Sequence, residues 1–503
     1  MKIKKETKKE IKKEKKKDVK KKYGLFKALL VILVLVIVAT YFIKSREDSI
    51  SYLPLGDVFV NYIQSFYYFF DTAIFIGVVG GLYGALNKTL AYKKLVKRIA
   101  KFFDNKKKVF VIVVTIVFAL LSSLSGLNLL LLIFVPFVVS VILLLGYDKM
   151  VALSSTVLAI VVGFIGGIFV TFKDASGYYE TTYKTFDMLV GFESNYETII
   201  PRIILLVLSI GLLVFYTISR IKKIEKGEVK DELGKSDVFL VQAKTKDGKV
   251  VKVDDSKVKV WPLVVMFILL LLLLVLGYFP WASLFKIEVF GDFHNWLTSR
   301  TIGDYAVFTS LVSSQFAAFG EWGGLGSFMM AMVVIAVFLL VLKFVARIKF
   351  SDLMDGFIYG VKKMIPAIMV AMLAYSVLVC SYNNGFIETV ITAAADKFGD
   401  NVVVGSLISL VGSIMHVDVY YTVASTFTPI VSSLTEKANL SVYSVMFQSL
   451  YGLVQGFGPT SLLLIVGLSY LEVPYGKWLK YIWRLVLGLI IIIFVTLMIL
   501  TLI

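Results

Sequence analysis

The chain carries little charge and almost no cysteine or histidine for its length. Charged residues make up 17% of its 503 residues, whereas an ordinary soluble domain carries about a quarter. The one cysteine, Cys380, leaves no disulfide framework and no cysteine metal site. Since only two histidines occur, His294 and His416, the sequence also lacks the His-Glu spacing of zinc enzymes.

Several short motifs of enzymes and pumps are missing as well. No Gly-x-x-x-x-Gly-Lys-Ser/Thr loop occurs, which argues against a nucleotide-driven pump, and no nucleophile-elbow motif is present. We therefore expect no enzyme. An intramembrane enzyme and a channel remain alternatives. Labelling of Ser413 or Ser125 by a serine-directed covalent probe would favour the enzyme, and single-channel currents would favour the channel.

Long apolar runs dominate instead, and hydrophobic residues make up 58% of the chain. A helix needs roughly 20 apolar residues to cross a bilayer core of ~30 Å. The runs show no strand-like alternation, so we predict an all-α polytopic membrane protein rather than a membrane barrel. We identify nine full spans and two interrupted hairpins whose halves look short for a span. The spans are 23–44, 66–86, 151–172, 199–219, 261–280, 322–345, 364–381, 442–469 and 482–502, and the hairpins are 108–147 and 401–435.

The net charge of +18 is concentrated at the N-terminus. Residues 1–22 contain 13 Lys and four acidic residues, directly before an apolar stretch. This pattern predicts a disordered cytoplasmic tail that orients the first helix and touches the lipid bilayer, with no nucleic-acid partner.

Loop charges support one orientation in the cell membrane, with the N-terminus cytoplasmic and the C-terminus outside. Basic residues exceed acidic ones in every segment that this orientation places inside, and acidic residues exceed basic ones outside. The agreement requires both interrupted regions to return to the side from which they enter, which predicts re-entrant hairpins. The inside segments are 87–108, 220–260, 343–363 and 472–484, and the outside segments are 45–65, 173–198, 281–321 and 382–400.

The order of elements occurs twice, in residues 66–219 and in residues 364–502. These two series lie within a first transmembrane half, 23–219, and a second, 261–503, which a cytoplasmic linker at 220–260 separates. Each half contains a span, an amphipathic segment, a hairpin, an interrupted span and a last span. The two series begin on opposite sides of the membrane, which predicts two inverted repeats. Inverted repeats with discontinuous helices are typical of secondary transporters, whose substrate sites lie near the middle of the bilayer.

Hairpin one is interrupted by small polar residues. The candidate substrate-binding residues here are Ser122, Ser123, Ser125, Gly126 and Asn128. Free amides at a helix N-terminus would attract an anionic group. The alternative is that each serine bonds back to a carbonyl of its own helix.

The partner span 151–172 contains three glycines that predict a helix break, Gly163, Gly166 and Gly167. Glycines allow a helix to unwind, although close helix packing would explain them equally well.

Hairpin two is interrupted at Ser413, His416 and Asp418. Ionisable groups deep in a bilayer are costly and usually line a pathway or bind an ion. We therefore interpret these residues as binding a substrate ammonium, a proton or a cation. A structural His–Asp contact and a shallow hairpin tip are the alternatives.

The second interrupted span carries the clearest break. Proline removes a backbone amide and clashes with the preceding turn, which frees carbonyls before the break and amides after it. A plain proline kink is the alternative. The candidate substrate-binding residues are Gln455, Gly456, Gly458, Pro459, Thr460 and Ser461.

Four aromatic residues lie beside Lys477 and Lys480, near the start of the last span. Aromatic and basic residues at a helix end are typical of an interfacial anchor, and we expect this role for Tyr475, Trp478, Tyr481 and Trp483.

Four stretches resemble one known family over roughly residues 50 to 503. These are Gly77–Gly84, Pro136 through Asp148, Gln455–Ser461 and the Pro-Tyr-x-Lys-Trp-x-Lys sequence at Pro474–Lys480. The chain resembles the YfcC-type carriers, which are grouped with the C4-dicarboxylate anaerobic carriers and proposed basic amino-acid antiporters of the ion-transporter superfamily.

The resemblance implies a two-repeat secondary transporter, an antiporter or ion-coupled symporter, that moves C4-dicarboxylates or amino acids by alternating access. Its partners would be a small-molecule substrate and a coupling ion, Na⁺ or H⁺, with no cofactor. Three positions depart from the family pattern: Leu127-Asn128 replaces paired acids, Gly167-Ile168-Phe169 replaces an Asn-Pro-Phe break, and His416-Val417-Asp418 replaces a small-residue tip. We also consider a homodimer with a subunit contact through residues 284–320.

Overall fold

The computed structural model describes the chain at residues 24–42, 52–168, 171–173, 179–181, 196–229, 233–234, 239–240, 258–279, 281–311, 313, 316–322, 328–398, 401–415, 418–433 and 440–502. The predicted tail at 1–22, most of the linker 220–260, His416 and Phe169 lie outside these residues.

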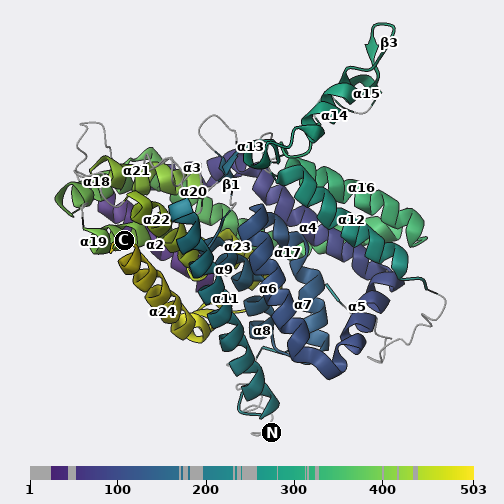
Figure 1. Cartoon of the computed structure of the whole chain (residues 1–503), viewed down its shortest axis with the longest axis horizontal. Helices are drawn as coiled ribbons and strands as arrows, with labels where there is room; N and C mark the ends of the chain where they lie inside the picture. The colour runs from purple at the N-terminus through teal and green to yellow at the C-terminus, as the bar shows by residue number, and fades with distance from the viewer. Residues whose placement is uncertain are drawn as a thin grey trace, which may run out of the picture.

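Helices make up nearly all of the described structure (Figure 1). The first half contains α2 (Gly24–Phe42), α3 (Leu55–Tyr68), α4 (Phe70–Lys88), α5 (Leu90–Phe102), η1 (Asp104–Lys106), α6 (Lys107–Ser125), η2 (Leu129–Ile133), α7 (Val135–Leu144), α8 (Lys149–Ser155), α9 (Val157–Ile165) and α11 (Tyr196–Glu225). The second half contains α12 (Trp261–Tyr278), α13 (Trp281–Phe285), α14 (Val289–Thr298), α15 (Val307–Leu311), α16 (Met329–Val345), α17 (Phe350–Asn383), α18 (Phe386–Phe398), α19 (Val402–Met415), α20 (Val419–Thr422), the π-helix η3 (Val423–Phe427), α21 (Thr428–Ser432), α22 (Leu440–Val454), α23 (Leu462–Leu471) and α24 (Tyr475–Leu500).

Two short antiparallel ladders complete the described structure. Strand β1 (Thr171–Lys173) pairs with β2 (Tyr179–Thr181), and β3 (Thr301–Ile302) pairs with β4 (Tyr305–Ala306).

Seven helices in the described part of the chain are long and apolar enough to cross a membrane. Six of them, α2, α4, α11, α12, α17 and α24, overlap predicted spans. The seventh, Asp104–Ser125, joins η1 to α6, which is the first arm of predicted hairpin one. The expectation that both arms of this hairpin are short is wrong for α6, because its 19 helical residues extend for about 28 Å.

The other three predicted spans contain shorter helices. Span 151–172 is divided into α8 and α9 at Thr156, whose φ of −121° and ψ of −81° are not helical, and α9 already ends at Ile165. Span 442–469 is divided into α22 and α23, and span 322–345 contains only the 17 residues of α16. The chain is thus an all-α polytopic membrane protein. Helix breaks lie in both interrupted spans.

Helices α4 and α17 cross at the centre of the molecule (Figure 1). Gly84 lies against Gly356, and Gly80 lies against Gly360, so closely that a Cβ on any of the four would overlap backbone atoms of the other helix. Small residues allow membrane helices to approach to backbone contact, which provides packing where no hydrophobic effect operates between helices. The Gly77–Gly84 segment therefore has a structural reason for its glycines.

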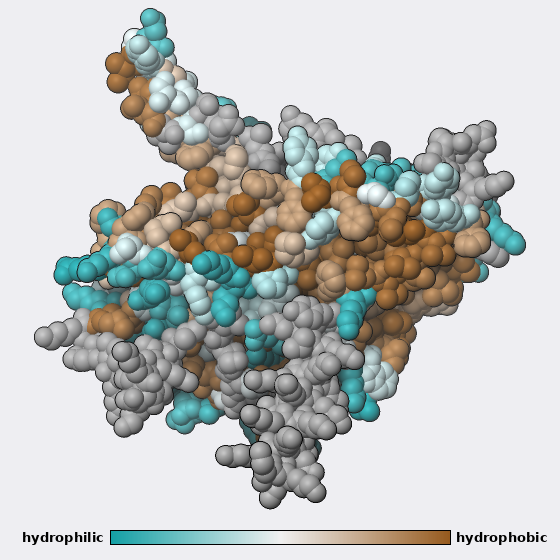
Figure 2. All heavy atoms as spheres, turned by 180° about the vertical axis from the view of Figure 1, so that it is seen from behind, coloured by the Kyte–Doolittle hydropathy of each residue, from teal (hydrophilic) through white to brown (hydrophobic). Residues whose placement is uncertain are grey.

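The outer helices bury one stripe and expose the other. In α24, Ile482, Leu485 and Leu489 are buried at helical spacing, whereas Leu487 and Ile491 are exposed. Figure 2 shows hydrophobic side chains covering a broad band of one face, with hydrophilic side chains on either side of it. Such a band is the surface that lipid tails would cover.

Residues 284–320 include α14, β3, β4 and α15, which project from the body (Figure 1). Several large apolar side chains of this arm are exposed: Val289, Phe293, Trp296, Ile302, Tyr305 and Leu311. A subunit contact through this arm stays a prediction.

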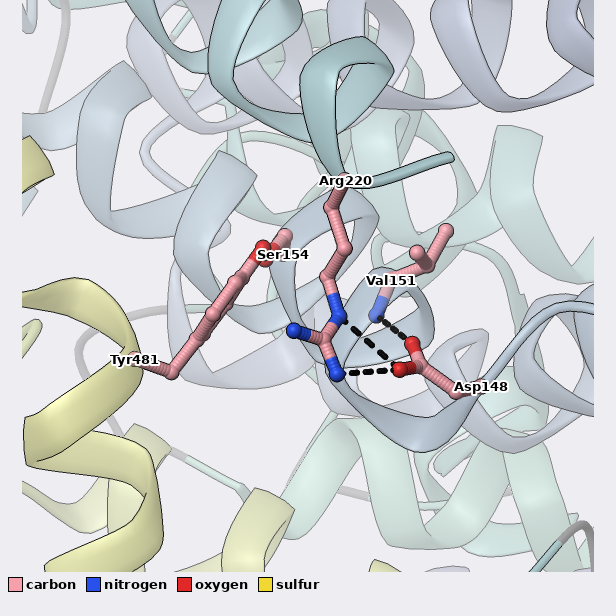
Figure 3. A network of polar contacts seen from close by, with 5 residues as sticks. All are labelled: Asp148, Val151, Ser154, Arg220 and Tyr481. Atoms are coloured by element: carbon pink, nitrogen blue, oxygen red, sulfur yellow. Dashed lines mark hydrogen bonds and ion pairs between the residues drawn. The ribbon is translucent and has the colours of Figure 1, made fainter. Parts of the chain in front are cut away.

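A polar network joins α8, α11 and α24 (Figure 3). Asp148 caps α8 by accepting from the Val151 amide at 2.9 Å, and it forms an ion pair with Arg220. The Arg220 guanidinium also lies 4.7 Å from the centre of the Tyr481 ring, and the Tyr481 hydroxyl lies 3.0 Å from Ser154 Oγ. The network thus fixes the segment after hairpin one to α11 and α24, the last helices of the two halves.

Candidate functional site

Hairpin one meets the first broken helix directly. The Ser122 hydroxyl lies 2.7 Å from the carbonyl oxygen of Ile160, and the Ser123 hydroxyl donates to the Gly166 carbonyl at 3.0 Å. The Ile168 amide donates back to the Ser123 carbonyl at 3.1 Å. The structure therefore brings the tip of α6 to the C-terminal end of α9.

The polar residues of this tip satisfy one another. Ser122 Oγ is 2.6 Å from Asn128 Oδ1, and Ser125 donates to the Leu121 carbonyl of its own helix. Gly126 ends α6 in the left-handed conformation, with φ of 66°, which glycine adopts at little cost. Of the three serines, only Ser125 bonds to a carbonyl of its own helix, whereas Ser122 and Ser123 lie against carbonyls of α9.

The glycines of the first broken helix serve close packing. A Cβ on Gly163 would overlap the carbonyl oxygen of Ala119 in α6, and a Cβ on Gly166 would overlap the backbone of Leu206 in α11. The Gly167 carbonyl accepts a hydrogen bond from the Gln448 side chain. Close packing thus explains Gly163 and Gly166, and α9 also ends at Ile165, beside Gly166 and Gly167.

Hairpin two has arms in contact and buried hydroxyls between them. Gly412 of α19 lies against the Thr426 side chain of η3, where a Cβ would overlap the hydroxyl. Ser413 Oγ and Thr426 Oγ1 are buried and have no hydrogen-bond partner in the described part of the chain. His416 lies outside the described residues.

Asp418 is half-buried and directly precedes α20. Its carbonyl accepts from the Thr422 hydroxyl at 2.9 Å. The Tyr375 ring stacks on Phe69, with ring centres 3.6 Å apart. Asp418 thus places an acidic group at the start of the second arm of hairpin two.

The second broken helix meets hairpin two. Helix α22 ends at Val454, and α23 begins at Leu462 after a non-helical segment that contains Gly458 and Pro459. Within this segment the Thr460 hydroxyl donates to the Ile414 carbonyl of α19 at 2.8 Å. The Ser461 side chain caps α23 by accepting from the Leu464 amide at 3.2 Å, and it donates to the Gln455 carbonyl at 2.8 Å.

Hydrogen-bond donors stay open at this second meeting point. Gln455 is 7% exposed, and its Nε2 has no partner among the described residues. The first amides of a helix have no partner within the helix. Since Ser461 satisfies only Leu464, the Leu462 and Leu463 amides have no bond within the described structure. Open donors at a helix N-terminus favour an anion.

Aromatic residues of α24 close the carbonyl side of the same break. Trp478 Nε1 donates to the Gly456 carbonyl at 2.9 Å, and the Tyr475 hydroxyl donates to the Phe457 carbonyl at 2.6 Å. Trp478 is fully buried, so its interpretation as an interfacial anchor is wrong; Trp483, which is exposed, still fits that role. The Pro-Tyr-x-Lys-Trp motif therefore supports the break.

Arg202 is a buried residue that the motif analysis missed. This arginine of α11 donates through Nε to Gln448 Oε1 at 2.9 Å and through a terminal nitrogen to Ser444 Oγ at 2.7 Å. Gln448 in turn donates to the carbonyls of Phe164, at 3.3 Å, and Gly167. A lone arginine inside predicted span 199–219 was the available signal, because intramembrane charges are rare and usually functional.

The described residues contain no group of three or more His, Cys, Asp or Glu side chains that could hold a metal ion. The polar atoms that remain near the two breaks are hydroxyls, amides, carbonyls and the Asp418 carboxylate. Such groups can bind a carboxylate through donors and an alkali cation through oxygen atoms.

A model of the C4-dicarboxylate anaerobic carrier family matches residues 60–502. No curated protein matches the chain. A crystal structure of the Alcanivorax borkumensis YdaH transporter aligns over 95% of this chain and 97% of its own, with 11% identity and a TM-score of 0.39. Since the family model spans most of the sequence, the chain belongs to the C4-dicarboxylate anaerobic carrier family and is a multi-pass membrane transporter.

Proposed function

We propose that the protein is a secondary active carrier of C4-dicarboxylates in the cell membrane, coupled to Na⁺ or H⁺ and working by alternating access. The observation that carries this proposal is the second meeting point, where hairpin two touches the broken helix α22–α23. The elements that meet there carry buried donors without partners among the described residues, namely the hydroxyls of Ser413 and Thr426 and the Gln455 amide. A buried donor left unbonded costs about 1–3 kcal/mol, which a bound carboxylate would recover.

Asp418 supplies the negative charge that ion coupling requires. Asp418 is a half-buried residue of hairpin two, and an acidic group in this position can bind a cation or a proton. We place the coupling ion at Asp418 and the substrate carboxylate at the donors of Gln455 and Ser413. The departure of this tip from the family pattern leaves the choice between Na⁺ and H⁺ to experiment.

Counterflow in proteoliposomes tests the proposal. Vesicles loaded with unlabelled succinate should take up radiolabelled succinate, and a panel of amino acids and monocarboxylates should compete less well. Absence of counterflow for every C4-dicarboxylate would contradict the substrate class.

The Asp418→Asn variant tests the coupling ion separately. In a thermal-shift assay, Na⁺ or a pH change should alter the unfolding temperature of the native protein with substrate, because ligands stabilise the state that binds them. Asp418→Asn should lose the ion effect. The exposed residue Asp352 offers a matched control, since Asp352→Asn should keep it.

A further inference from the structure

An apolar groove opens on the outside of the molecule between α4, α16 and α17. It has a volume of about 300 Å³, which is at the lower end of the range for ligand sites. Its lining is wholly apolar: Val78, Met332, Ile335, Ala336, Leu339, Leu340, Phe350, Leu353, Met354 and Phe357. Several of these side chains remain exposed, with Phe350 at 56% and Leu340 at 55%.

The α16 residues that line the groove form a stripe that ends at a lysine, Lys343. Met332, Ile335 and Leu339 follow one another at helical spacing, and Lys343 continues the same stripe one turn later. Lys343 lies in the last turn of α16, with its Nζ 4.6 Å from the centre of the Phe344 ring. The apolar groove therefore ends beside an ammonium group.

Two more cations lie in the turn that joins α16 to α17. Arg347 and Lys349 are both exposed, and Lys349 is the residue directly before α17. No ion pair engages Lys343, Arg347 or Lys349 within the described residues. One end of the groove thus carries three positive charges within seven residues.

The nearby acids do not share this surface. Asp352 and Asp355 are in the first turns of α17, whose groove face is formed by Phe350, Leu353, Met354 and Phe357. At 100° per residue, both acids lie roughly 150° around the helix from the middle of that face. The charge at the groove end is therefore positive rather than balanced.

We propose that this groove binds an anionic phospholipid, with one acyl chain along the α16 stripe and the phosphate headgroup at Lys343, Arg347 and Lys349. Apolar surface accepts the chain without loss of hydrogen bonds, and a basic cluster beside membrane helices is the usual partner of an acidic headgroup. The site lies on α4, α16 and α17 and includes no residue of the two helix breaks. Its test needs no transport substrate.

The experiment uses the purified full-length protein in detergent, with dioleoylphosphatidylglycerol or dioleoylphosphatidylcholine added. Native mass spectrometry counts the lipids that stay bound. Each basic residue at a membrane surface is worth about 1 kcal/mol towards anionic lipid, so the native protein should prefer the anionic lipid at least about tenfold. The variant K343Q/R347Q/K349Q should lose this preference. The control K101Q/K362Q/K363Q, which removes three exposed lysines elsewhere, should keep it.

A second pair of variants tests the groove itself. Ala336→Trp fills it and should reduce retention of both lipids, whereas Val337→Trp, at an exposed neighbour outside the lining, should not. The proposal is overturned if the native protein shows no lipid preference, or if Ala336→Trp retains the anionic lipid as before. It is also overturned if Ala336→Trp converts a dimer to a monomer while lipid retention is unchanged, because a second copy then covers the groove.

Discussion

The two hairpins and the two helix breaks form matching pairs, but only the second pair keeps open donors. In the first half, Ser122 and Ser123 bond to the carbonyls of Ile160 and Gly166, and little polar capacity is left. In the second half, Thr460 bonds to the Ile414 carbonyl, while Ser413 Oγ and Gln455 Nε2 have no partner in the described structure. The donors of the hairpin and the break are therefore bonded in the first half, whereas some of them have no partner in the described part of the second half.

The difference also appears at the helix ends. The carbonyl end of α9 is occupied, because Gln448 donates to Phe164 and Gly167. At the second break the carbonyls of Gly456 and Phe457 are likewise occupied, by Trp478 and Tyr475, but the amide end of α23 is open. A hairpin and a helix break in each half therefore do not make two equal sites. Side chains from the other half or from the last helix decide which ends remain available to a solute.

The largest effect should follow from Arg202→Gln. This change removes the donors to Gln448 and Ser444 and leaves buried acceptors unbonded, at a cost of about 2–4 kcal/mol. It also removes the hydrogen bond that orients the Gln448 side chain, whose amide donates to the α9 carbonyls. A thermal unfolding scan in detergent measures the loss.

Arg484→Gln is the matched control, because Arg484 is an exposed arginine of α24 and its replacement should cost at most about 0.5 kcal/mol. Equal unfolding temperatures for the two variants would show that the buried arginine does not hold the first break.

The ends of α6 and α22 could be predicted from the sequence, but the break at Thr156 between α8 and α9 could not. Glycine, proline and clustered serine oppose a regular helix wherever they occur, so the ends at Ser125 and Val454 follow from local chemistry. The sequence underestimates the length of α6, because the Ser122–Ser125 segment continues the helix.

Which polar groups stay open could not be predicted. That outcome depends on contacts between residues far apart in the sequence, such as Ser123 with Gly166 and Gln448 with Phe164. The role of Trp478 was missed for the same reason. A tryptophan beside lysines at a helix start gives one pattern whether it lies in the interface or caps a carbonyl, and only the fold separates the two.

A matched pair of glycine substitutions tests the tightness of the two breaks. In Gly163→Ala the new methyl group overlaps the Ala119 carbonyl, so α6 and α9 must separate, which should cost about 1–3 kcal/mol. In Gly456→Ala the nearest atom is Leu158 Cδ1 at 3.2 Å, the end of a flexible side chain, and the cost should stay below about 1 kcal/mol. Unfolding temperatures of both variants measure the difference. The opposite order would mean that the second break is the tighter one.

The smallest expected effects come from replacing one unbonded donor and one bonded donor, and they test the difference between the two halves most directly. Gln455→Leu removes an open donor, so it should weaken C4-dicarboxylate binding about tenfold, or about 1.4 kcal/mol, and should not lower the stability of the unliganded protein. Ser123→Ala removes a satisfied donor, so it should lower stability by about 1 kcal/mol and leave binding almost unchanged. Thermal shifts with and without succinate separate the two effects, because only binding makes the shift depend on ligand concentration. If Ser123→Ala weakened binding as much as Gln455→Leu, both halves would contact the substrate. The proposed difference, bonded donors in the first half and unbonded donors in the second, would then be wrong.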